Sequence, residues 1–285
     1  MKILGKEVSK KIKDYIASNT LNKNIRLVII RVGEDPASIK YTNNKLKAAE
    51  KVGIYCDLKV LPEDIQQREF DDIFEKTIKS DFTDGIIVQL PIPKHLNLDL
   101  VNNLYNKYPE KDVDGFSELN VGTLHLSKGY KTDFNIPCTA KGCIDMIDST
   151  GYDLSGKVAL VIGRSNIVGR PVARMLEQKN ATVIQCHSRT TKEQIEKLGQ
   201  QADVVIVAIG KAHCYKTSQF PNATIFIDVG INVNAEGKLV GDLLDDANIA
   251  EDGNKYISPV PGGVGPMTVA NLLLNTYNSH ERRIK

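Results

Sequence analysis

The sequence has 285 residues, the length of one large domain or two ordinary ones. It is 41% hydrophobic and 25% charged, and this average globular composition excludes a disordered chain and a small scaffold held by disulfides or metal. With 37 Lys plus Arg and 35 Asp plus Glu, the formal net charge is +2, so we expect no nucleic-acid partner.

The apolar segments are too short to cross a membrane. The longest, such as 204–209, have the length of a strand, whereas a membrane helix needs about 18 residues. Charged residues such as Lys2, Lys6 and Glu7 interrupt the first apolar residues, so we expect neither a signal peptide nor a transit peptide. These features predict a cytoplasmic protein without a membrane partner.

The five cysteines predict reduced and mostly buried thiols. No Cys-x-x-Cys pair occurs and no histidine stands at zinc-ligand spacing, so we predict no metal. Cys138 and Cys143 could form a redox pair, but two small residues that pack at the start of a helix are the simpler interpretation.

The first half alternates strand and helix patterns. Amphipathic patterns predict helices over 37–52 and 63–79, and β-branched runs predict strands over 25–32, 54–61 and 85–90. Such alternation is typical of a largely parallel sheet. The stretch 93–137 is less regular, and we expect it to connect or cap.

The alternation starts again after Lys157. The expected strands are 158–162, 182–186, 204–209 and 225–229, and the expected helices are 168–179, 192–198 and the tail after Pro266. We therefore predict an α/β protein of two α/β domains, the second a Rossmann-like doubly wound parallel sheet.

A glycine-containing loop follows the first strand of the second half. The segment Gly163-Arg-Ser-Asn-Ile-Val-Gly169 lies between a strand and a helix, where doubly wound folds bind the phosphates of a cofactor. Arg164 and Ser165 add hydrogen-bond donors to this loop. Because Ser165 replaces the middle glycine of the general fingerprint, a glycine turn in a nucleotide-free sheet stays an alternative.

The end of the next strand favours NADP over NAD. NAD enzymes hold the ribose 2′-hydroxyl with an acid about 20 residues after the glycines. Here the strand ends in Cys186-His-Ser-Arg189 without an acid. Ser188 and Arg189 could instead contact a 2′-phosphate, although a solvated strand end explains them as well.

Candidate catalytic residues lie in the first half. Tyr41 and Lys45 stand four residues apart, so they share one face of a helix. A surface pair is the simplest explanation of that spacing, which also occurs in short-chain dehydrogenases, but downstream of the nucleotide loop. Here it lies upstream, which favours a site assembled between two domains. Gln89 ends a strand, where open parallel sheets bind ligands.

Two further segments have the composition of a site. Asp112 and Asp114, in Lys111-Asp-Val-Asp-Gly115, are either functional acids or part of an Asx turn. The loop 259–266 combines prolines with glycines, so it suits either a flat ligand or a rigid hinge.

These motifs together resemble the bifunctional methylenetetrahydrofolate dehydrogenase/methenyltetrahydrofolate cyclohydrolase family over nearly the whole chain. The matching blocks, in the family's order, are 32–45, 85–91, 111–116, 137–139, 163–171, 228–231 and 259–268. The resemblance implies NADP-dependent oxidation of 5,10-methylenetetrahydrofolate to the 5,10-methenyl form and hydrolysis of that product to 10-formyltetrahydrofolate, in one-carbon metabolism. It also implies a homodimer and a folate cleft between the domains.

The resemblance further implies domain and residue roles. Residues 1–137, joined by the C-terminal helix 267–285, would bind folate, and residues 138–266 would bind NADP. Lys45 matches the family's essential lysine, and Gln89 matches the amide that interacts with this lysine. Tyr41 matches a ring that stacks on or near the folate. Asp114 matches the acid that binds the pterin-like end. Val88, Leu90, Pro261, Gly262 and Gly263 match the folate site, and Gly163, Arg164, Ser165, Ser188 and Ile231 match cofactor contacts.

The chain departs from the family pattern at two places. Ser117-Glu118 stands where the family usually has His-Pro, and Ala140 replaces a common proline. Both departures bear on the geometry of the loop near Asp114. An amino-acid or shikimate-type NADP dehydrogenase with two similar domains is the alternative enzyme. A cofactor- or folate-binding regulator would leave Tyr41, Lys45 and Gln89 unexplained.

Overall fold

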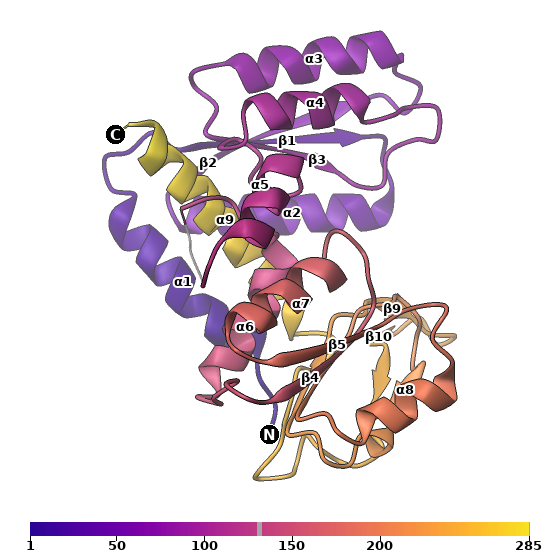
Figure 1. The fold of residues 1–285 in the computed structure, drawn as a ribbon. Coiled ribbons are helices and arrows are strands. Elements are labelled where there is room, and N and C mark those ends of the chain that lie inside the picture. The colour runs from indigo at the N-terminus through magenta and orange to yellow at the C-terminus, as the bar shows by residue number, and fades with distance from the viewer. Residues whose placement is uncertain (130–132, 285) are drawn as a thin grey trace. The chain divides into compact units, whose positions relative to one another are not determined.

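The computed structural model describes residues 1–129 and 133–284 (Figure 1). It contains two compact units, each built of a parallel sheet and helices. The described residues of the three-stranded unit are 11–123, 133–138 and 269–284, and those of the five-stranded unit are 1–10, 124–129 and 139–268. The boundaries fall inside or at the start of helices α1 (Gly5–Asn19), α5 (Glu118–Leu126), α6 (Cys138–Ser149) and α9 (Val264–Arg283). The prediction of two α/β domains is confirmed.

The sheet of the three-stranded unit has the order β2-β1-β3, with all strands parallel. Its elements are β1 (Arg26–Val32), α2 (Pro36–Lys51), β2 (Tyr55–Leu61), α3 (Gln67–Lys79), β3 (Gly85–Gln89) and α4 (Asp99–Lys107). Because β2 and β3 lie on opposite sides of β1, the connection from β1 to β2 and the connection from β2 to β3 run in opposite directions across the sheet. Open sheets bind ligands at the carboxyl ends of strands at such a switch point.

Each face of this sheet has its own hydrophobic core. Val28 and Ile30 of β1 pack with Phe70 and Phe74 of α3 and with residues of α4, whereas Leu27 and Ile29 face α2 and α9. Figure 1 shows α3 and α4 on one face of the sheet and α2 on the other. The alternation of β1 residues between two apolar faces explains the continuous β-branched pattern of this strand.

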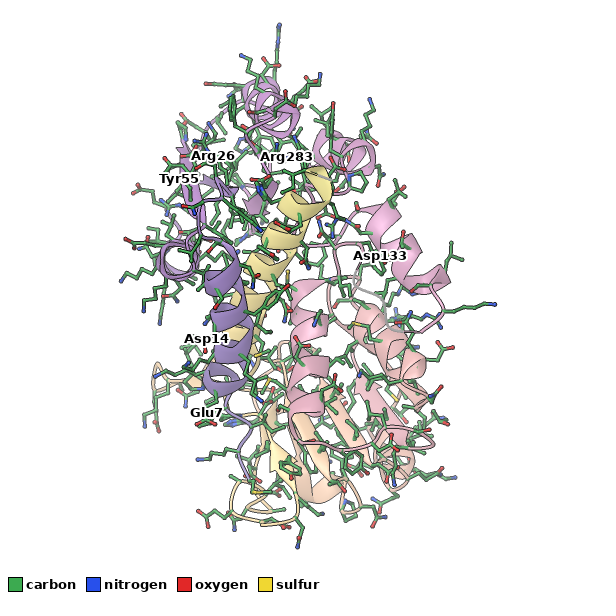
Figure 2. All side chains as sticks on the ribbon, turned by 90° about the vertical axis from the view of Figure 1, so that its left-hand side faces the viewer. Glu7, Asp14, Arg26, Tyr55, Asp133 and Arg283 are labelled. Carbon is green, nitrogen blue, oxygen red and sulfur yellow. The ribbon has the colours of Figure 1, made fainter. Side chains whose placement is uncertain are left out.

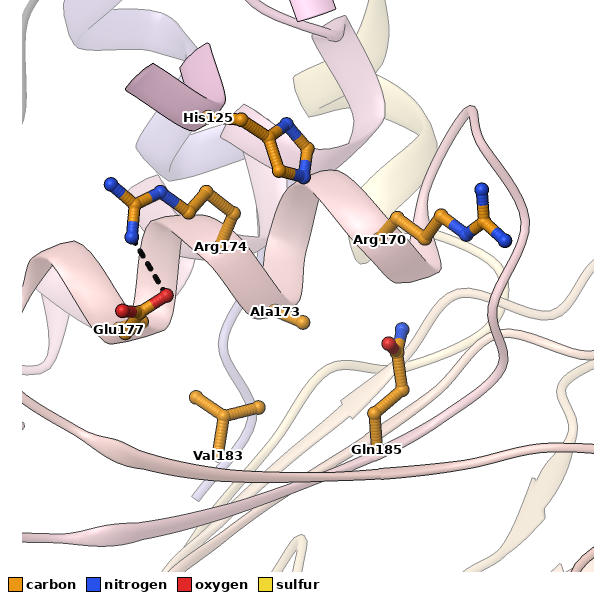
Figure 3. Close-up of a pocket in the computed structure, with 7 residues that line it drawn as sticks. All are labelled: His125, Arg170, Ala173, Arg174, Glu177, Val183 and Gln185. Carbon is orange, nitrogen blue, oxygen red and sulfur yellow. Dashed lines mark hydrogen bonds and ion pairs between the residues drawn. The ribbon is translucent and has the colours of Figure 1, made fainter. Parts of the chain in front are cut away.

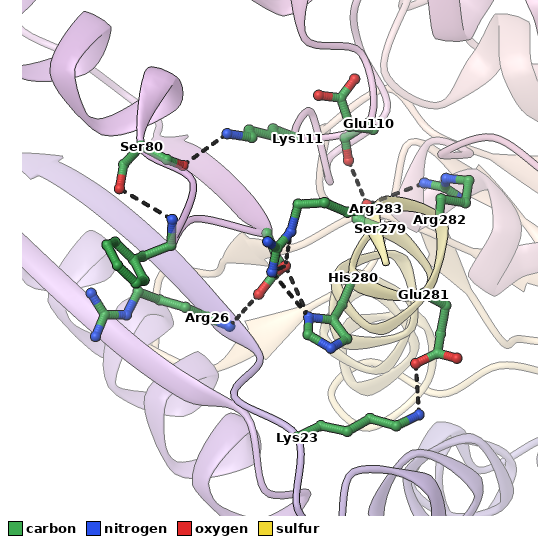
Figure 4. Close-up of polar contacts among 12 residues, drawn as sticks. Lys23, Arg26, Ser80, Glu110, Lys111, Ser279, His280, Glu281, Arg282 and Arg283 are labelled. Carbon is green, nitrogen blue, oxygen red and sulfur yellow. Dashed lines mark hydrogen bonds and ion pairs between the residues drawn. The ribbon is translucent and has the colours of Figure 1, made fainter. Parts of the chain in front are cut away.

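The end of α9 is tied to the start of β3 (Figure 4). Asp84 is 1% exposed, and its Oδ1 accepts hydrogen bonds from Nε and Nη2 of Arg283 over 2.9 and 2.7 Å. His280 Nδ1 lies 3.0 Å from the same oxygen, and the amide of Arg26 donates to Oδ2. Figure 2 labels Arg26, whose guanidinium lies 4.8 Å from the ring centroid of Tyr55. These contacts anchor the last turn of α9 within the three-stranded unit.

The five-stranded unit has a parallel sheet in the order β12-β8-β6-β4-β5. Its main elements are β4 (Val158–Ile162), α7 (Gly169–Gln178), β5 (Thr182–Cys186), α8 (Lys192–Gly199), β6 (Val204–Val207), β8 (Ile225–Asp228) and β12 (Tyr256–Ile257). Short elements complete it: β7 (Tyr215–Lys216), the 3₁₀ helix η1 (Thr217–Gln219), β9 (Asn232–Val233), β10 (Leu239–Val240) and β11 (Leu243–Leu244). Since β5 and β6 flank β4, the switch point lies at the carboxyl end of β4.

The stretch 93–137, expected to be less regular, contains two helices that the sequence did not predict, α4 and α5. Helix α4 has no side-chain cap at Leu98, and Gly122 weakens the helical pattern of α5 although Ser117 precedes its first turn. The sequence also did not predict α1 and α6, and α3 begins at Gln67 rather than at residue 63. The other predicted elements are found with small shifts of their ends.

The cysteine prediction is confirmed. All five thiols are free, and Cys138, Cys143 and Cys186 are buried. No helix in the described ranges, 1–129 and 133–284, is long and apolar enough to span a membrane.

Candidate active site

Lys45 and Gln89 meet at the carboxyl edge of the three-stranded sheet. Lys45 lies on the face of α2 that also carries the buried Thr42 and Ala49. Its Nζ donates a hydrogen bond to Oε1 of Gln89 over 2.9 Å. Gln89 Nε2 donates to the carbonyl of Leu90 over 2.8 Å, so the amide oxygen is turned toward the lysine. Two residues proposed on separate sequence arguments therefore form one contact.

Tyr41 shares α2 with Lys45, and Arg31 lies on β1 opposite Gln89. Tyr41 precedes Lys45 by about one helical turn, and its ring is 41% exposed, so it is available for stacking. Arg31, the register partner of Gln89 on β1, is 6% exposed. Its guanidinium donates to the carbonyl of Gly33 over 3.1 Å and contacts Thr42 Oγ1 at 3.4 Å. The sequence reasoning missed this buried cation, because a charged residue in an apolar strand gives no signal of its surroundings.

The two acids of the 111–115 segment have different roles. Asp112 is 1% exposed and accepts hydrogen bonds from the amides of Gly115 and Ser117 and from Asn120 Nδ2, over 3.0, 2.7 and 2.9 Å. Asp112 therefore forms the Asx turn. Gly115 has a φ of +76°, and a Cβ there would lie 2.6 Å from the backbone carbon of Ile136. The turn consequently requires glycine at this position.

Asp114 is the acid that the turn leaves available. Its carboxylate forms no hydrogen bond within the part of the chain that the structure describes, 1–129 and 133–284. Burial raises the pKa of Asp114 to about 6, the Lys45 ammonium acts in the opposite direction, and Asp112 adds to the rise. Lys45, which bonds Gln89, therefore also acts on the charge of Asp114. A carboxyl group with this pKa changes charge close to neutral pH.

Two residues that the sequence reasoning missed hold the backbone beside Asp114. Asn275 of α9 donates from Nδ2 to the carbonyls of Val113 and Ile136, over 2.8 and 2.9 Å. The thiol of Cys138 donates to the same Val113 carbonyl over 3.2 Å, and burial raises the pKa of Cys138 well above its usual value. No sequence signal links these residues, because they are far apart along the chain.

The departure at Ser117-Glu118 leaves the turn well supported. Ser117 is 4% exposed, and its Oγ accepts a hydrogen bond from the amide of Asn120 in the first turn of α5. Its own amide donates to Asp112. Ser117 therefore acts as the N-terminal cap of α5. At the other departure, the side chain of Ala140 is fully buried in α6.

The loop after β4 is shaped to let a ligand approach the backbone. Gly163 has a φ of +137°, and a Cβ there would lie 2.4 Å from the carbonyl oxygen of Ala208. A Cβ at Gly169 would lie equally close to the carbonyl oxygen of Gly163. Ser165 Oγ accepts from the amides of Val168 and Gly169 over 3.2 and 3.3 Å, and Arg164 is exposed. At the position where the general fingerprint has glycine, this serine thus bonds two amides at the start of α7.

The residues expected at the adenosine end also lie in the five-stranded unit. Ser188 and Arg189 are exposed just after β5. The loop is held by the amide of His187, which donates to Thr190 Oγ1 over 3.1 Å. Ile231, after β8, is 48% exposed. The lack of an acid between 186 and 190 and the exposed guanidinium fit a 2′-phosphate group.

The residues expected around the folate are divided between the units. Val88 is 8% exposed and packs in the core, so a ligand would reach its main chain, whereas Leu90 is 47% exposed. Pro261, Gly262 and Gly263 belong to the five-stranded unit, where the carbonyl of Gly262 accepts from the amide of Gly5 over 2.9 Å.

A separate cavity of about 470 Å³ lies beside α7 and β5 (Figure 3). Its lining consists of His125, Arg170, Ala173, Arg174, Glu177, Val183 and Gln185. None of the sequence-predicted site residues lines it. Gln185 nevertheless donates to the carbonyl of Gly163 over 3.0 Å, so the cavity wall touches the glycine loop.

Two family models match the chain. The model "Tetrahydrofolate dehydrogenase/cyclohydrolase, catalytic domain" matches residues 3–114, and "Tetrahydrofolate dehydrogenase/cyclohydrolase, NAD(P)-binding domain" matches residues 137–284. The chain is 41% identical over 285 residues to the bifunctional protein FolD of Bacillus pumilus, covering 98% of this chain and 97% of the relative.

Solved structures agree with these matches. The bifunctional FolD enzyme of Campylobacter jejuni aligns with a TM-score of 0.89 and 39% identity, covering 99% of each chain. The enzyme of Trypanosoma brucei, solved with NADP cofactor and an inhibitor, aligns with a TM-score of 0.89 and 30% identity, covering 100% of this chain and 98% of that one.

Proposed function

The chain belongs to the tetrahydrofolate dehydrogenase/cyclohydrolase family, and from this premise we propose that Lys45, Gln89 and Asp114 form its active site. The chain is a bifunctional enzyme that oxidises 5,10-methylenetetrahydrofolate to the methenyl form and hydrolyses that product to 10-formyltetrahydrofolate. The family match decides against an amino-acid or shikimate-type dehydrogenase. The hydrogen bond from Lys45 to Gln89, beside an acid with a raised pKa, is the observation that carries the proposed site.

The hydrolysis requires a proton to move. Water attacks the cationic methenyl carbon, so a proton must leave that water and later reach a ring nitrogen. Lys45 is the residue proposed to accept and return this proton. Its partner Gln89 is neutral, so the amide orients Nζ without fixing the positive charge as a carboxylate would.

The remaining residues of the three-stranded unit bind and orient the folate. Tyr41 presents an exposed ring for stacking, and the Asp114 carboxylate accepts hydrogen bonds from the pterin-like end. Further proposed folate contacts are Val88, Leu90, Pro261, Gly262 and Gly263. In the dehydrogenase step orientation is the main task of these residues, because the folate nitrogens themselves push electrons toward the departing hydride.

The loops of the five-stranded unit fit NADP. When bound, NADP supplies the hydride acceptor. Gly163 lets the backbone approach a diphosphate, and Arg164, Ser165 and Ile231 are proposed as further contacts. Ser188 and Arg189 would hold the 2′-phosphate. The NADP complex of the Trypanosoma brucei relative supports this choice of cofactor.

We further propose a cytoplasmic homodimer with neither a nucleic-acid nor a membrane partner. The small net charge argues against a nucleic-acid partner, and the free thiols favour the cytoplasm. The homodimer rests on the resemblance to the family. The folate-binding part is proposed as 1–137 with 267–285, and the NADP-binding part as 138–266.

Absorbance assays of the wild-type protein test this function. We expect 5,10-methylenetetrahydrofolate to be oxidised faster with NADP than with NAD, and added methenyltetrahydrofolate to decay faster with enzyme than without it. Absence of turnover with both cofactors would contradict the proposal.

A further inference from the structure

Two buried aspartates lie together at the carboxyl edge of the five-stranded sheet. Asp228 is the last residue of β8 and is 4% exposed, and Asp242, between β10 and β11, is fully buried. Neither carboxylate forms an ion pair with any residue that the structure describes. Burying a charge without an opposite charge requires several hydrogen bonds to offset its desolvation.

The Asp242 carboxylate joins two loops that follow neighbouring strands. Its Oδ2 accepts hydrogen bonds from the amides of Ile209 and Gly210, over 2.8 and 3.0 Å, in the loop after β6. Its Oδ1 accepts from the amide of Lys211 over 2.8 Å and from Nδ2 of Asn232 over 3.0 Å. Because Asn232 lies after β8, one carboxylate holds both loops.

The Asp228 carboxylate binds the backbone of the Asp242 segment and of its own loop. Its Oδ1 accepts from the amides of Gly230 and Asp242, each over 2.9 Å, and its Oδ2 accepts from the amide of Leu243 over 2.9 Å. Burial raises the pKa of Asp228 to about 6, against the effect of these three amides. The loop after β8 is therefore bonded both to Asp228, through Gly230, and to Asp242, through Asn232.

The two aspartates require a glycine in each other's segment. A Cβ at Gly230 would lie 2.2 Å from Asp242 Oδ1, and a Cβ at Gly241 would lie 1.8 Å from Asp228 Oδ2. Any side chain at either glycine would displace a carboxylate. The Asp242 carboxylate thus needs glycine at position 230, and the Asp228 carboxylate needs glycine at position 241.

We propose that Asp242, supported by Asp228, is a positioning residue that fixes the loops after β6 and β8 for cofactor binding. This inference rests on the proposed function. The residue between Gly230 and Asn232 is Ile231, a proposed NADP contact, so both of its chain neighbours are held by the aspartate pair. Loops fixed before the cofactor arrives lose less conformational freedom on binding, which favours affinity.

The test is NADP binding by titration calorimetry, together with both activities, in Asp242→Asn. An amide at this position replaces one acceptor oxygen by an NH₂ group that faces N–H donors. We expect the Kd for NADP to rise at least tenfold. Hydrolysis of methenyltetrahydrofolate should stay within twofold of wild type, because Lys45, Gln89 and Asp114 lie in the other compact unit.

Two further variants keep the test decisive if Asp242→Asn does not fold. Asn232→Ala removes one donor and leaves the carboxylate in place, and it should raise the Kd for NADP about threefold to tenfold. The control is Asp245→Asn. Asp245 also accepts backbone amides, those of Ile249 and Ala250, but it contacts neither loop. This control should bind NADP within twofold of wild type.

Unchanged NADP affinity in Asp242→Asn or Asn232→Ala would overturn the inference. A variant that folds and binds NADP as wild type does, but loses oxidation and hydrolysis to the same extent, would also overturn it. A wild-type protein that does not bind NADP would overturn the proposed function, and this inference with it. If wild type binds NADP and both variants bind it with the same Kd, only the role of Asp242 is contradicted and the proposed function stands.

Discussion

Lys45 donates from Nζ to Oε1 of Gln89 over 2.9 Å, and the partner of this lysine is therefore a neutral amide rather than a carboxylate. The amide is itself oriented by its bond to the Leu90 carbonyl. A neutral acceptor orients the ammonium without forming an ion pair with it.

Replacing the neutral partner by an anion should impair hydrolysis. Gln89→Glu places a carboxylate beside Nζ, which stabilises the ammonium and opposes its service as a base. We expect hydrolysis of methenyltetrahydrofolate at pH 7 to fall at least about tenfold and to recover partly as the pH rises. Hydride transfer, measured on the same preparation, should fall less. A Gln89→Glu enzyme that hydrolyses at the wild-type rate at pH 7 would show that charge at this position is unimportant.

Folate affinity should depend on pH through Asp114. Burial raises the pKa of Asp114 to about 6, so the carboxyl group is ionised above that pH and neutral below it. The KM for 5,10-methylenetetrahydrofolate should therefore rise as the pH falls below about 6, by up to about tenfold per pH unit. An aspartate with the ordinary pKa of 3.8 would delay this rise to about pH 4. The matched variant Asp114→Asn should show a high KM that does not change over the same range.

Cofactor choice should depend on the loop after β5. Arg189→Ala removes the exposed guanidinium proposed to contact the 2′-phosphate, and Ser188→Ala removes a neighbouring hydroxyl. We expect each to lower kcat/KM for NADP by about tenfold or more, because a hydrogen bond to a charged group contributes roughly 1.5–3 kcal/mol. The value for NAD should stay within about twofold. Arg68→Ala, which removes an exposed guanidinium from α3 in the other compact unit, is the control and should leave both values unchanged. Equal losses with both cofactors would contradict the assignment.

The serine at the departure from the family pattern should stabilise the protein. Ser117→Ala removes the cap that accepts the amide of Asn120, at a cost of about 1 kcal/mol. We expect the midpoint of thermal unfolding to fall by about 2–4 °C. Ser18→Ala, which changes an exposed serine bonded to the Asp14 carbonyl, should have a smaller effect. If both variants unfold at the wild-type temperature, Ser117 is not an effective cap.

Much of the fold could be predicted because most strands of the two parallel sheets, β1, β3, β4, β6 and β8, are buried and read as apolar runs. The same regularity placed Lys45 and Gln89 correctly, since a helix face and a strand end are both visible in the sequence. Helix α4 was missed because it has no side-chain cap at its start, and α5 because Gly122 weakens its helical pattern.

The surroundings of Asp114 could not be predicted. Local sequence did not separate Asp112, which forms the turn, from Asp114, which forms no hydrogen bond with any described residue. The difference depends on contacts from Asn120 and on the backbone near Ile136. The contact of Asn275 with Val113 joins residues 162 positions apart, and no periodicity reports it.

The most direct test of the active site is a comparison of both activities in Lys45→Met, with Lys47→Met, an exposed neighbour on α2, as the control. We predict that Lys45→Met loses hydrolysis of methenyltetrahydrofolate by about 100-fold or more, while measurable NADP-dependent oxidation of 5,10-methylenetetrahydrofolate remains. Equal loss of the two activities would contradict the account and would make Lys45 a binding or structural residue.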